Sequence, residues 1–311
     1  MAVVTTMDDP LIAPVAPAEW PKALELVFCQ LPEDDQRRQV DAALGAALCG
    51  DVSPEGLFGA SRGGQLVGAA FSQIQPGKTA TVWMPRLVST VSDATAAKLL
   101  GAVCDWLSQK RVCTAQILAE GCTESEATML QQWGFDHLAD LLYLVSLEDE
   151  FPESLPTTTL EFQPYSEGDH ERLARIIEAT YQQTLDCPRL NSVRAIDDVL
   201  AGYRGTGVFD PARWLVVRHQ GRDVGCLLLA DHPQHENYEL VYMGVVAAAR
   251  GHHWGIQMTR YAQWLARKAK RPRLVLAVDA ANGPAITIYA AAGFRAWDQR
   301  SVFLKVFAAG A

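Results

Sequence analysis

The stretch YELVYMGVVAAARGHHWGIQM, residues 238–258, passes from an apolar run through a turn with two glycines into an amphipathic run. The apolar run YELVYMGVV predicts a buried β-strand. Apolar residues at Trp254, Met258 and Tyr261 follow near helical spacing and predict a helix over 253–270. A helix that begins there leaves its first backbone N–H groups without partners, and the glycines keep side chains away from them. The stretch therefore predicts a phosphate-binding site.

The rest of the second half contains a hairpin and further strands and helices. The hairpin covers RWLVVRHQGRDVGCLLLADH, with Gln220-Gly221 near its turn. A later helix stops at Gly293, a residue typical of helix C-termini. Strands that cluster early and then alternate with helices predict an α+β fold, a mixed α/β arrangement. The other predicted strands cover 159–164, 273–280 and 294–306, and the other predicted helices cover 167–183, 192–204 and 282–292.

The first half of the chain repeats the order of elements in the second half. Gly134-Phe135 matches Gly293-Phe294 at an offset of 159 residues, and DWLSQK matches QWLARK at an offset of 158. Between the halves, LEDEFPESLPTT has the acidic, proline-containing composition of a linker. The repeat predicts two domains, 1–150 and 151–311. A coincidence between two similar α/β patterns is the alternative.

Composition limits the classes of function. The 311 residues carry a net charge of −9, which argues against a nucleic-acid partner. The first half has 9 Lys and Arg against 20 Asp and Glu, whereas the second half has 18 against 16. The second half can thus accept a polyanionic small molecule, although acidic surfaces also serve solubility alone. No apolar run reaches the roughly 18 residues of a membrane span, and the N-terminus does not resemble a signal peptide.

Cysteine usage indicates a reducing compartment. The seven cysteines are an odd number without CxxC spacing, which argues against a disulfide framework or a zinc cluster. We therefore expect a cytoplasmic location. The adjacent His252 and His253 lack the spacing and partners of a metal site, so no metal is expected.

Three stretches together resemble a known family. YELVYMGVV, ARGHHWG and NGPAITIYAAAGF occur in the order and with the spacing of the GNAT superfamily of acyl-CoA N-acyltransferases. The resemblance covers about 150 residues of the second half well and the whole chain more faintly. It implies two tandem GNAT-like domains, each with a mixed central sheet flanked by helices. It also implies acetyl-CoA as the co-substrate.

The resemblance places coenzyme binding on the turn before the helix and on the helix that follows the next strand. Backbone N–H groups and the positive end of the helix dipole suit a pyrophosphate. At His253 the sequence departs from the glycine of the family, so this side chain narrows the approach, demands a less comfortable backbone, or donates to a phosphate. The implied coenzyme-binding residues are Gly244, Val245, Val246, Arg250, Gly251, His252, His253, Trp254, Gly255, Asn282, Ala285 and Tyr289.

The resemblance also implies catalytic roles for two residues. Tyr289 is expected to protonate the departing thiolate, because a positioned phenol is a sensible acid for that group. Glu239 begins an apolar strand, where a carboxylate is costly without a task, and is expected to be the base for a primary amine. The backbone near Gly244 is expected to polarise the thioester carbonyl. The implied reaction is direct transfer in a ternary complex, with a small-molecule or peptide amine as acceptor.

The first half lacks the corresponding residues. At the offset of 159, Asn282 maps to Thr123, Tyr289 to Leu130, Glu239 to Ala80 and Arg250 to Val91. Its loop STVSDATAA has no glycine and contains Asp93, which would repel a pyrophosphate. We expect this half to have lost coenzyme binding and to serve as a scaffold.

The sequence leaves several alternatives open. A non-catalytic acyl-CoA-binding or protein-interaction module is the alternative to an enzyme, and oligomerisation is possible. Segments within 184–212 are the least patterned part of the second half, and we expect them to shape acceptor specificity.

Overall fold

The computed structural model describes residues 9–49, 54–89, 91–191 and 193–307. For Leu48, Cys49, Pro54, Asp93 and Ser125 the description is confined to the backbone. The chain divides into two compact units. The N-terminal unit contains Met1–His137 with Phe303–Ala311, and the C-terminal unit contains Leu138–Val302. Within the described residues, no helix is long and apolar enough to cross a membrane.

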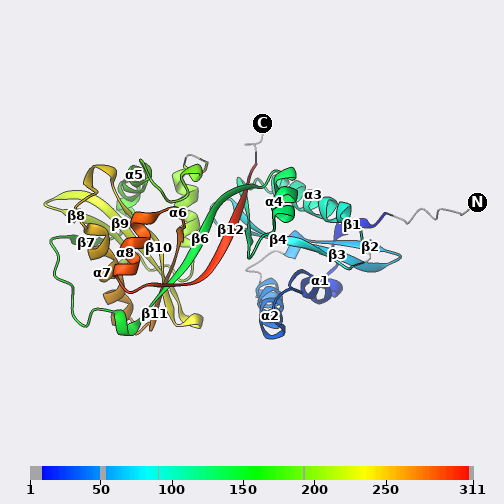
Figure 1. Ribbon diagram of the computed structural model, residues 1–311, viewed down its shortest axis with the longest axis horizontal. Helices are drawn as coiled ribbons and strands as arrows, with labels where there is room; N and C mark the ends of the chain where they lie inside the picture. The colour runs from blue at the N-terminus through cyan, green and yellow to red at the C-terminus, as the bar shows by residue number, and fades with distance from the viewer. Residues whose placement is uncertain (1–8, 50–53, 90, 192, 308–311) are drawn as a thin grey trace, which may run out of the picture. The chain divides into compact units, whose positions relative to one another are not determined.

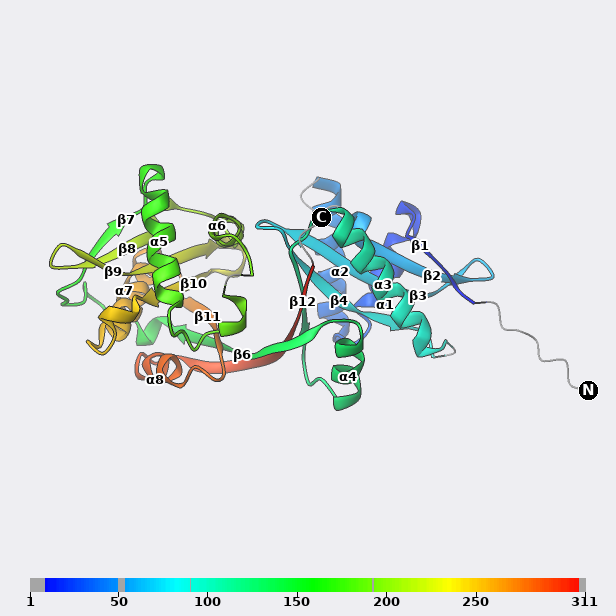
Figure 2. The ribbon, with the colours of Figure 1, turned by 90° about the horizontal axis from the view of Figure 1, so that it is seen from above.

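The C-terminal unit is a mixed sheet with helices on both faces (Figures 1 and 2). Its strand order is β12-β6-β11-β10-β9-β8-β7. The sheet consists of β6 (Asp136–Leu147), β7 (Glu161–Pro164), β8 (Trp214–His219), β9 (Arg222–His232), β10 (Asn237–Val245), β11 (Arg273–Asp279) and β12 (Arg295–Val306). The helices are α5 (His170–Tyr181), α6 (Ile196–Arg204), α7 (Trp254–Lys268) and α8 (Gly283–Ala291).

Alternation along the strands creates two cores in this unit. Successive strand residues point to opposite faces, so each strand supplies both cores. In β8, Leu215 and Val217 join the core under α7 and α8, whereas Trp214 and Val216 join the core under α5 and α6. The continuous apolar runs of β8 and β9 therefore reflect burial on both faces.

The N-terminal unit repeats the same order of elements, which confirms the α+β expectation for both halves. Its strand order is β1-β2-β3-β4-β5-β12. The strands are β1 (Leu11–Pro14), β2 (Leu57–Arg62), β3 (Gln65–Gln75), β4 (Thr79–Leu87) and β5 (Thr114–Ala119). The helices are α1 (Trp20–Val27), α2 (Glu33–Cys49), α3 (Asp93–Gln109) and α4 (Glu124–Gln132).

The last strand of each half of the sequence is divided between the two units. From Leu138 onward, β6 belongs to the C-terminal unit, where it pairs antiparallel with β11 from Leu147↔Arg273 to Leu141↔Asp279. Conversely, the end of β12 belongs to the N-terminal unit, where Phe303 is 2% exposed. The compact units therefore divide within β6 and within β12, whereas the sequence predicted one boundary after residue 150.

The predicted linker is held against α7. Arg267 donates from Nη2 to the carbonyl oxygens of Glu148 (2.6 Å) and Phe151 (2.9 Å), and Arg260 donates to the carbonyl of Glu150 (2.9 Å). The Phe151 ring is buried in the core beside α7 and α8. The start of this segment is therefore part of the C-terminal unit.

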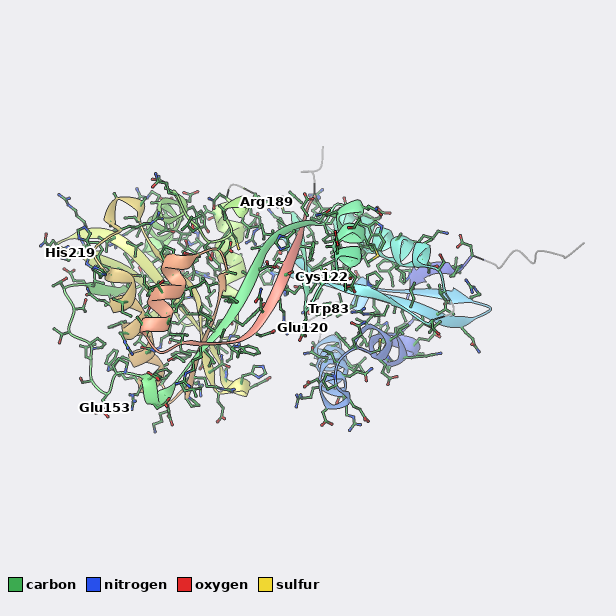
Figure 3. All side chains as sticks on the ribbon, in the orientation of Figure 1. Trp83, Glu120, Cys122, Glu153, Arg189 and His219 are labelled. Carbon is green, nitrogen blue, oxygen red and sulfur yellow. The ribbon has the colours of Figure 1, made fainter. Side chains whose placement is uncertain are left out.

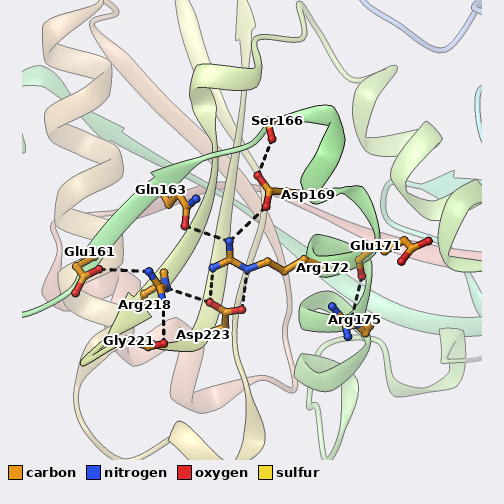
Figure 4. A network of polar contacts seen from close by, with 10 residues as sticks. All are labelled: Glu161, Gln163, Ser166, Asp169, Glu171, Arg172, Arg175, Arg218, Gly221 and Asp223. Atoms are coloured by element: carbon orange, nitrogen blue, oxygen red, sulfur yellow. Dashed lines mark hydrogen bonds and ion pairs between the residues drawn. The ribbon is translucent and has the colours of Figure 1, made fainter.

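A polar network fixes α5 to the β8–β9 hairpin (Figure 4). The Arg172 guanidinium donates to both carboxylate oxygens of Asp223, at 2.8 and 2.5 Å, and to Gln163 of β7 at 3.1 Å. A bidentate pair of this kind restrains direction as well as distance. The hydrogen bond from Arg172 holds the pKa of Asp223 below its usual range. The network orients α5, whose last turn reaches the cavity described below.

Strand β6 gives a test of the unit boundaries. A fragment of residues 138–302 retains β6, whereas a fragment of residues 151–302 exposes the edge of β11 and loses the core side chain of Leu144. It also loses Ser146, whose hydroxyl oxygen accepts from Gln263 at 2.8 Å. We expect the longer fragment to unfold cooperatively and the shorter one to be less stable by at least about 3 kcal/mol. Thermal unfolding followed by circular dichroism measures the difference. Equal midpoints would contradict the assignment of β6 to the C-terminal unit.

Candidate active site

A cavity of about 550 Å³ opens in the C-terminal unit. Its walls come from the loop that follows α5, the second part of β10, the turn before α7, and the first turns of α7 and α8. The volume lies within the range of small-molecule sites, which is roughly 300–1,000 Å³. All of its lining residues belong to this one unit.

The cavity exists because two parallel strands separate. Strands β10 and β11 pair only from Asn237↔Arg273 to Glu239↔Val275, although both strands continue. The register of β10 against β9 also shifts between Leu240 and Tyr242. Beyond this point one edge of β10 has lost its partner strand and lines the cavity.

Backbone N–H groups of β10 point into this gap. The Val246 N–H donates to the Val224 carbonyl on the β9 side, at 3.0 Å. Because successive N–H groups of a strand alternate in direction, those of Met243 and Val245 point away from β9. Donors of this kind suit the amide groups or the thioester carbonyl of an extended substrate.

The turn before α7 leaves the helix N-terminus uncapped by a side chain. Gly251 has a φ of +87°, which a glycine adopts without cost. The N-cap residue is His253, whose side chain makes no capping hydrogen bond, and the first turn of the helix contains no acidic residue. The first N–H groups of α7 are thus available to an anion.

His253 is in the left-handed region of the backbone map, with a φ of +56°. The sequence comparison with the family glycine predicted a less comfortable backbone here, and the structure confirms it. A non-glycine residue pays about 1–2 kcal/mol in this region. The neighbouring His252 has no positive φ, and its ring stacks on Trp254 at 4.7 Å.

Trp254 lies between two histidine rings. His252 is on one side, and His219 (labelled in Figure 3) is 4.9 Å from the same indole. Within the described residues, no group of three or more His, Cys, Asp or Glu side chains is arranged to hold a metal ion. His252, His253 and the Trp254 indole line the cavity, whereas His219 is not part of its wall.

Two of the predicted site glycines are required by packing. A Cβ on Gly255 would lie 2.8 Å from the Ile288 side chain of α8, so this glycine lets α7 and α8 approach closely. A Cβ on Gly244 would lie 2.7 Å from Thr180 of α5. Gly255 thus has a role in helix contact, and its predicted role in coenzyme binding stays a prediction, since both glycines line the cavity.

Arg250 has a structural role that the sequence did not indicate. Its nitrogens donate to the carbonyl oxygens of Thr180 (2.8 Å), Gln183 (3.0 Å) and Val245 (3.2 Å). The side chain thus joins the end of β10 to the end of α5. Arg250 is also part of the cavity wall, so its predicted contact with the coenzyme stays a prediction.

Tyr289 and Asn282 come to the cavity from α8, as the spacing predicted. Tyr289 is 7% exposed, and its hydroxyl makes no hydrogen bond to the residues that the structure describes. Burial, together with the nearby Asp186 carboxylate, raises the pKa of Tyr289 well above its usual range. The Asn282 side chain caps α8 by accepting from the Ala285 N–H at 3.3 Å. Ala285 also lines the cavity.

Glu239 does not reach the cavity wall. It lies on β10 just before the strands separate, and its carboxylate is 2.8 Å from Nε2 of His232. The hydrogen bond to Glu239 raises the pKa of His232. The geometry therefore gives no support to Glu239 as the base.

The loop after α5 brings residues to the cavity that the sequence did not single out. Asp186 and Cys187 lie there, and Tyr181, Tyr203 and Tyr242 line the adjoining wall. Burial raises the pKa of every one of these groups, as it does that of Tyr289. Several perturbed groups on one concave surface indicate a functional site. In the sequence, these residues were indicated only by the lack of a regular helix or strand pattern in segments within 184–212.

The N-terminal unit differs at the equivalent helix start. There the Ser92 hydroxyl caps α3 by accepting from the Ala94 N–H at 3.3 Å. A side chain of the chain itself thus satisfies the helix end that is uncapped in α7. The side chain of Asp93, which was expected to repel a phosphate, lies outside the described residues.

The fold and the site together define an acyltransferase-type domain, and comparison with known proteins agrees. Residues 177–294 match the family model "Acetyltransferase (GNAT) family". The second half of the chain therefore contains a domain of the GNAT acetyltransferase family, which confirms the resemblance found in the sequence.

Relatives extend the likeness to both halves. The chain is 27% identical to a mycothiol acetyltransferase of Pseudarthrobacter chlorophenolicus over 192 residues, which are 58% of this chain and 57% of that protein. A GCN5-related N-acetyltransferase from Sphaerobacter thermophilus has the same fold, with a TM-score of 0.64, 16% identity and 96% of each chain covered. A tandem GNAT protein from the clavulanic acid biosynthesis pathway aligns with a TM-score of 0.54 and 15% identity, over 97% of this chain and 99% of that one. The fold is thus that of tandem GNAT proteins.

The strain at His253 gives a prediction for stability. Replacing His253 by glycine removes the cost of the left-handed backbone but adds flexibility to the unfolded chain, so we expect a net gain of about 1 kcal/mol and about 2 °C in Tm. His252→Gly is the matched control, because its φ is not positive. Differential scanning calorimetry of the full chain distinguishes them, and an equal or greater gain in the control would refute this explanation.

Proposed function

We propose that the C-terminal unit transfers an acetyl group from acetyl-CoA to a primary amine while both are bound. The observation that carries the proposal is the meeting of three features in one cavity. These are the β10 edge left by the separated strands, the uncapped start of α7, and the Tyr289 hydroxyl. Acetyl-CoA combines a pyrophosphate, a linear amide-containing arm and a thioester, and each of these has a matching feature.

The coenzyme fits the cavity in one direction. Its pyrophosphate would bind at the N–H groups of Trp254 and Gly255, where the helix dipole favours negative charge. Its amide-containing arm would run along β10, where the N–H groups of Met243 and Val245 face the gap. The thioester would then lie between β10 and Tyr289.

Tyr289 is proposed as the acid. Its raised pKa keeps the phenol protonated throughout the physiological range, so a proton is always available for the sulfur of the leaving coenzyme. Its hydroxyl has no competing hydrogen bond within the described residues. A rate decrease at alkaline pH would therefore not come from Tyr289, because this group keeps its proton well above pH 10.

Direct transfer is favoured over a covalent enzyme intermediate. The thiol that lines the cavity belongs to Cys187, and burial together with the neighbouring Asp186 raises its pKa to about 12. A thiol with this pKa stays protonated and is a poor nucleophile near neutral pH. The acetyl group would then pass straight from sulfur to nitrogen in a ternary complex.

The acceptor is proposed only as a primary amine. The relative from Pseudarthrobacter chlorophenolicus is named a mycothiol acetyltransferase, and this chain spans 57% of its length. A mycothiol-type precursor is thus one candidate among small-molecule and peptide amines. The N-terminal unit is proposed as a scaffold, because its equivalent helix start is capped by Ser92.

The alternative is a unit that binds acyl-CoA without turnover. The strained His253 motivates this alternative, because the turn departs from the usual glycine. Release of free thiol from acetyl-CoA in the presence of a primary amine excludes it. A panel of aromatic, sugar and peptide amines, assayed with a thiol reagent, is the direct test.

Coenzyme binding can be tested at His252, whose side chain is exposed beside the uncapped helix. His252→Glu places a negative charge near the proposed pyrophosphate and preserves the helix, since acidic residues suit helix N-termini. We expect one acetyl-CoA per chain by calorimetry and an affinity about tenfold weaker in this variant, from a repulsion of about 1 kcal/mol or more. His252→Gln is the control and should bind like the parent. Equal affinities, or two sites per chain, would contradict this placement.

Tyr289→Phe tests the acid. The variant keeps the ring and its contact with Phe294 but loses the hydroxyl. We expect kcat to fall about 10²-fold or more, while the Kd of acetyl-CoA changes less than twofold. Steady-state kinetics and calorimetry on the same preparation separate the two effects. Parallel losses of rate and affinity would assign Tyr289 to binding instead.

A further inference from the structure

We propose that Asp186 is the carboxylate of the acceptor site, where it binds the ammonium group of the amine and takes its proton. The inference rests on the proposed function and adds to it the group that receives the acceptor. It also assigns to the loop after α5 the role of base that the sequence had given to Glu239 on β10.

Among the described residues that line the cavity, Asp186 is the only one with a carboxylate side chain. It is exposed to solvent and belongs to the wall of the cavity. An acceptor that enters the cavity can therefore touch it. By contrast, Glu239 lies outside the wall and is hydrogen-bonded to His232.

The Asp186 carboxylate is held by the main chain at the end of β11. The Asp279 N–H donates to its Oδ1 at 3.0 Å. Asp279 in turn accepts from the Cys187 N–H at 3.0 Å and from the Ala281 N–H at 2.8 Å. A carboxylate has about four acceptor positions, so this fixed group keeps capacity for a substrate N–H.

Asn282 lies between the two proposed groups in the sequence of the site. Its side-chain oxygen caps α8 by accepting from the Ala285 N–H at 3.3 Å, and its amide favours the ionised form of Asp186, which lowers the pKa of that carboxyl. We assign Asn282 as a positioning residue at the start of the helix that carries Tyr289.

Three tyrosines, Tyr181, Tyr203 and Tyr242, line the same cavity as Asp186. Tyr203 and Tyr242 are stacked with ring centroids 5.3 Å apart, and Tyr181 meets Tyr242 edge to face at 6.1 Å. Rings of this kind attract a cation placed over their faces. A carboxylate beside tyrosine rings suits an organic ammonium ion better than an anionic or a neutral acceptor.

The groups around Asp186 leave it as a usable base. The titratable groups that face it are Asp279, Cys187, Tyr242 and Tyr289, and Arg194 also lines the cavity. Burial, followed by the like charge of Asp279, opposes ionisation of Asp186, whereas the hydrogen bonds from Asp279 and Asn282 favour it. The net result is a raised pKa, which brings the carboxylate closer to the value of an efficient base.

The proton and electron movements balance. Asp186 takes a proton from the bound ammonium, and the nitrogen lone pair forms a bond to the thioester carbon. The C–S bond then breaks with its electron pair on sulfur, and Tyr289 donates a proton to that sulfur. The nitrogen then loses its second proton, which restores the Tyr289 hydroxyl, and Asp186 releases its proton to solvent. The products are the N-acetylated amine and free coenzyme thiol, and neither oxidant nor reductant is consumed.

Asp186→Asn in the full chain tests the assignment, with 2-phenylethylamine as acceptor. We expect kcat/KM for the amine to fall 10²- to 10⁴-fold, while the Kd of acetyl-CoA changes less than twofold. In the parent, kcat/KM should fall at acid pH with an apparent pKa above the usual value of about 4 for an aspartate, and Asp186→Asn should lose this acidic limb. Asp186→Glu should recover part of the rate and the limb. A loss below threefold in Asp186→Asn would overturn the proposal.

A binding measurement separates this proposal from the proposed function. Phenyltrimethylammonium is a cation that cannot be acetylated, and its affinity can be measured by calorimetry without turnover. We expect at least tenfold weaker binding in Asp186→Asn than in the parent or in Cys187→Ser, a neighbouring control in the same wall. If the parent transfers no acetyl group to any amine, the proposed function fails, and the cation still decides whether Asp186 forms an ammonium site. Equal affinities in all three proteins would refute that site.

Discussion

The separation of β10 from β11 is the constraint on which the C-terminal unit depends. Parallel strands normally stay paired, because each unpaired edge leaves backbone donors and acceptors without partners. Here the pairing ends at Glu239↔Val275, and the open edge lines a cavity instead of a core. Three links hold the gap open from its sides. They are Arg250 between β10 and α5, the Asp186–Asp279 contact at the end of β11, and the Arg172 network that orients α5.

The sequence predicted the fold because its signals were local. Strand and helix patterns, the repeat and the glycine-ended helices are properties of neighbouring residues, and tertiary packing did not override them. For the same reason Tyr289 and Asn282 came correctly to the cavity, since their seven-residue spacing on one helix decides that they share a face. The uncapped start of α7 followed from its own turn.

The roles that could not be predicted depend on contacts between distant segments. Arg250 is basic and lies beside the turn, which predicted a contact with the coenzyme. Its side chain also donates hydrogen bonds to the carbonyl oxygens of Thr180 and Gln183, which are distant in the sequence. Gly255 owes its lack of a side chain to Ile288 of another helix. The position of Glu239 relative to the gap depends on where pairing with β11 stops, which no local pattern encodes. Asp186 lies in a segment without periodicity, and its surroundings come from four different elements.

The return of the end of β12 to the N-terminal unit also orders the synthesis of the protein in time. The core of the N-terminal unit includes Phe303, yet the chain leaves that unit after β5 and α4 and returns only after the whole C-terminal unit has been made. Between Ala119 and Phe303 the ribosome needs roughly 10–40 s at ordinary rates of elongation. During that interval β5 presents an open edge, whereas the C-terminal unit receives β6 before its own strands emerge. The second unit can therefore complete its sheet as it is made, and the first must wait for the second.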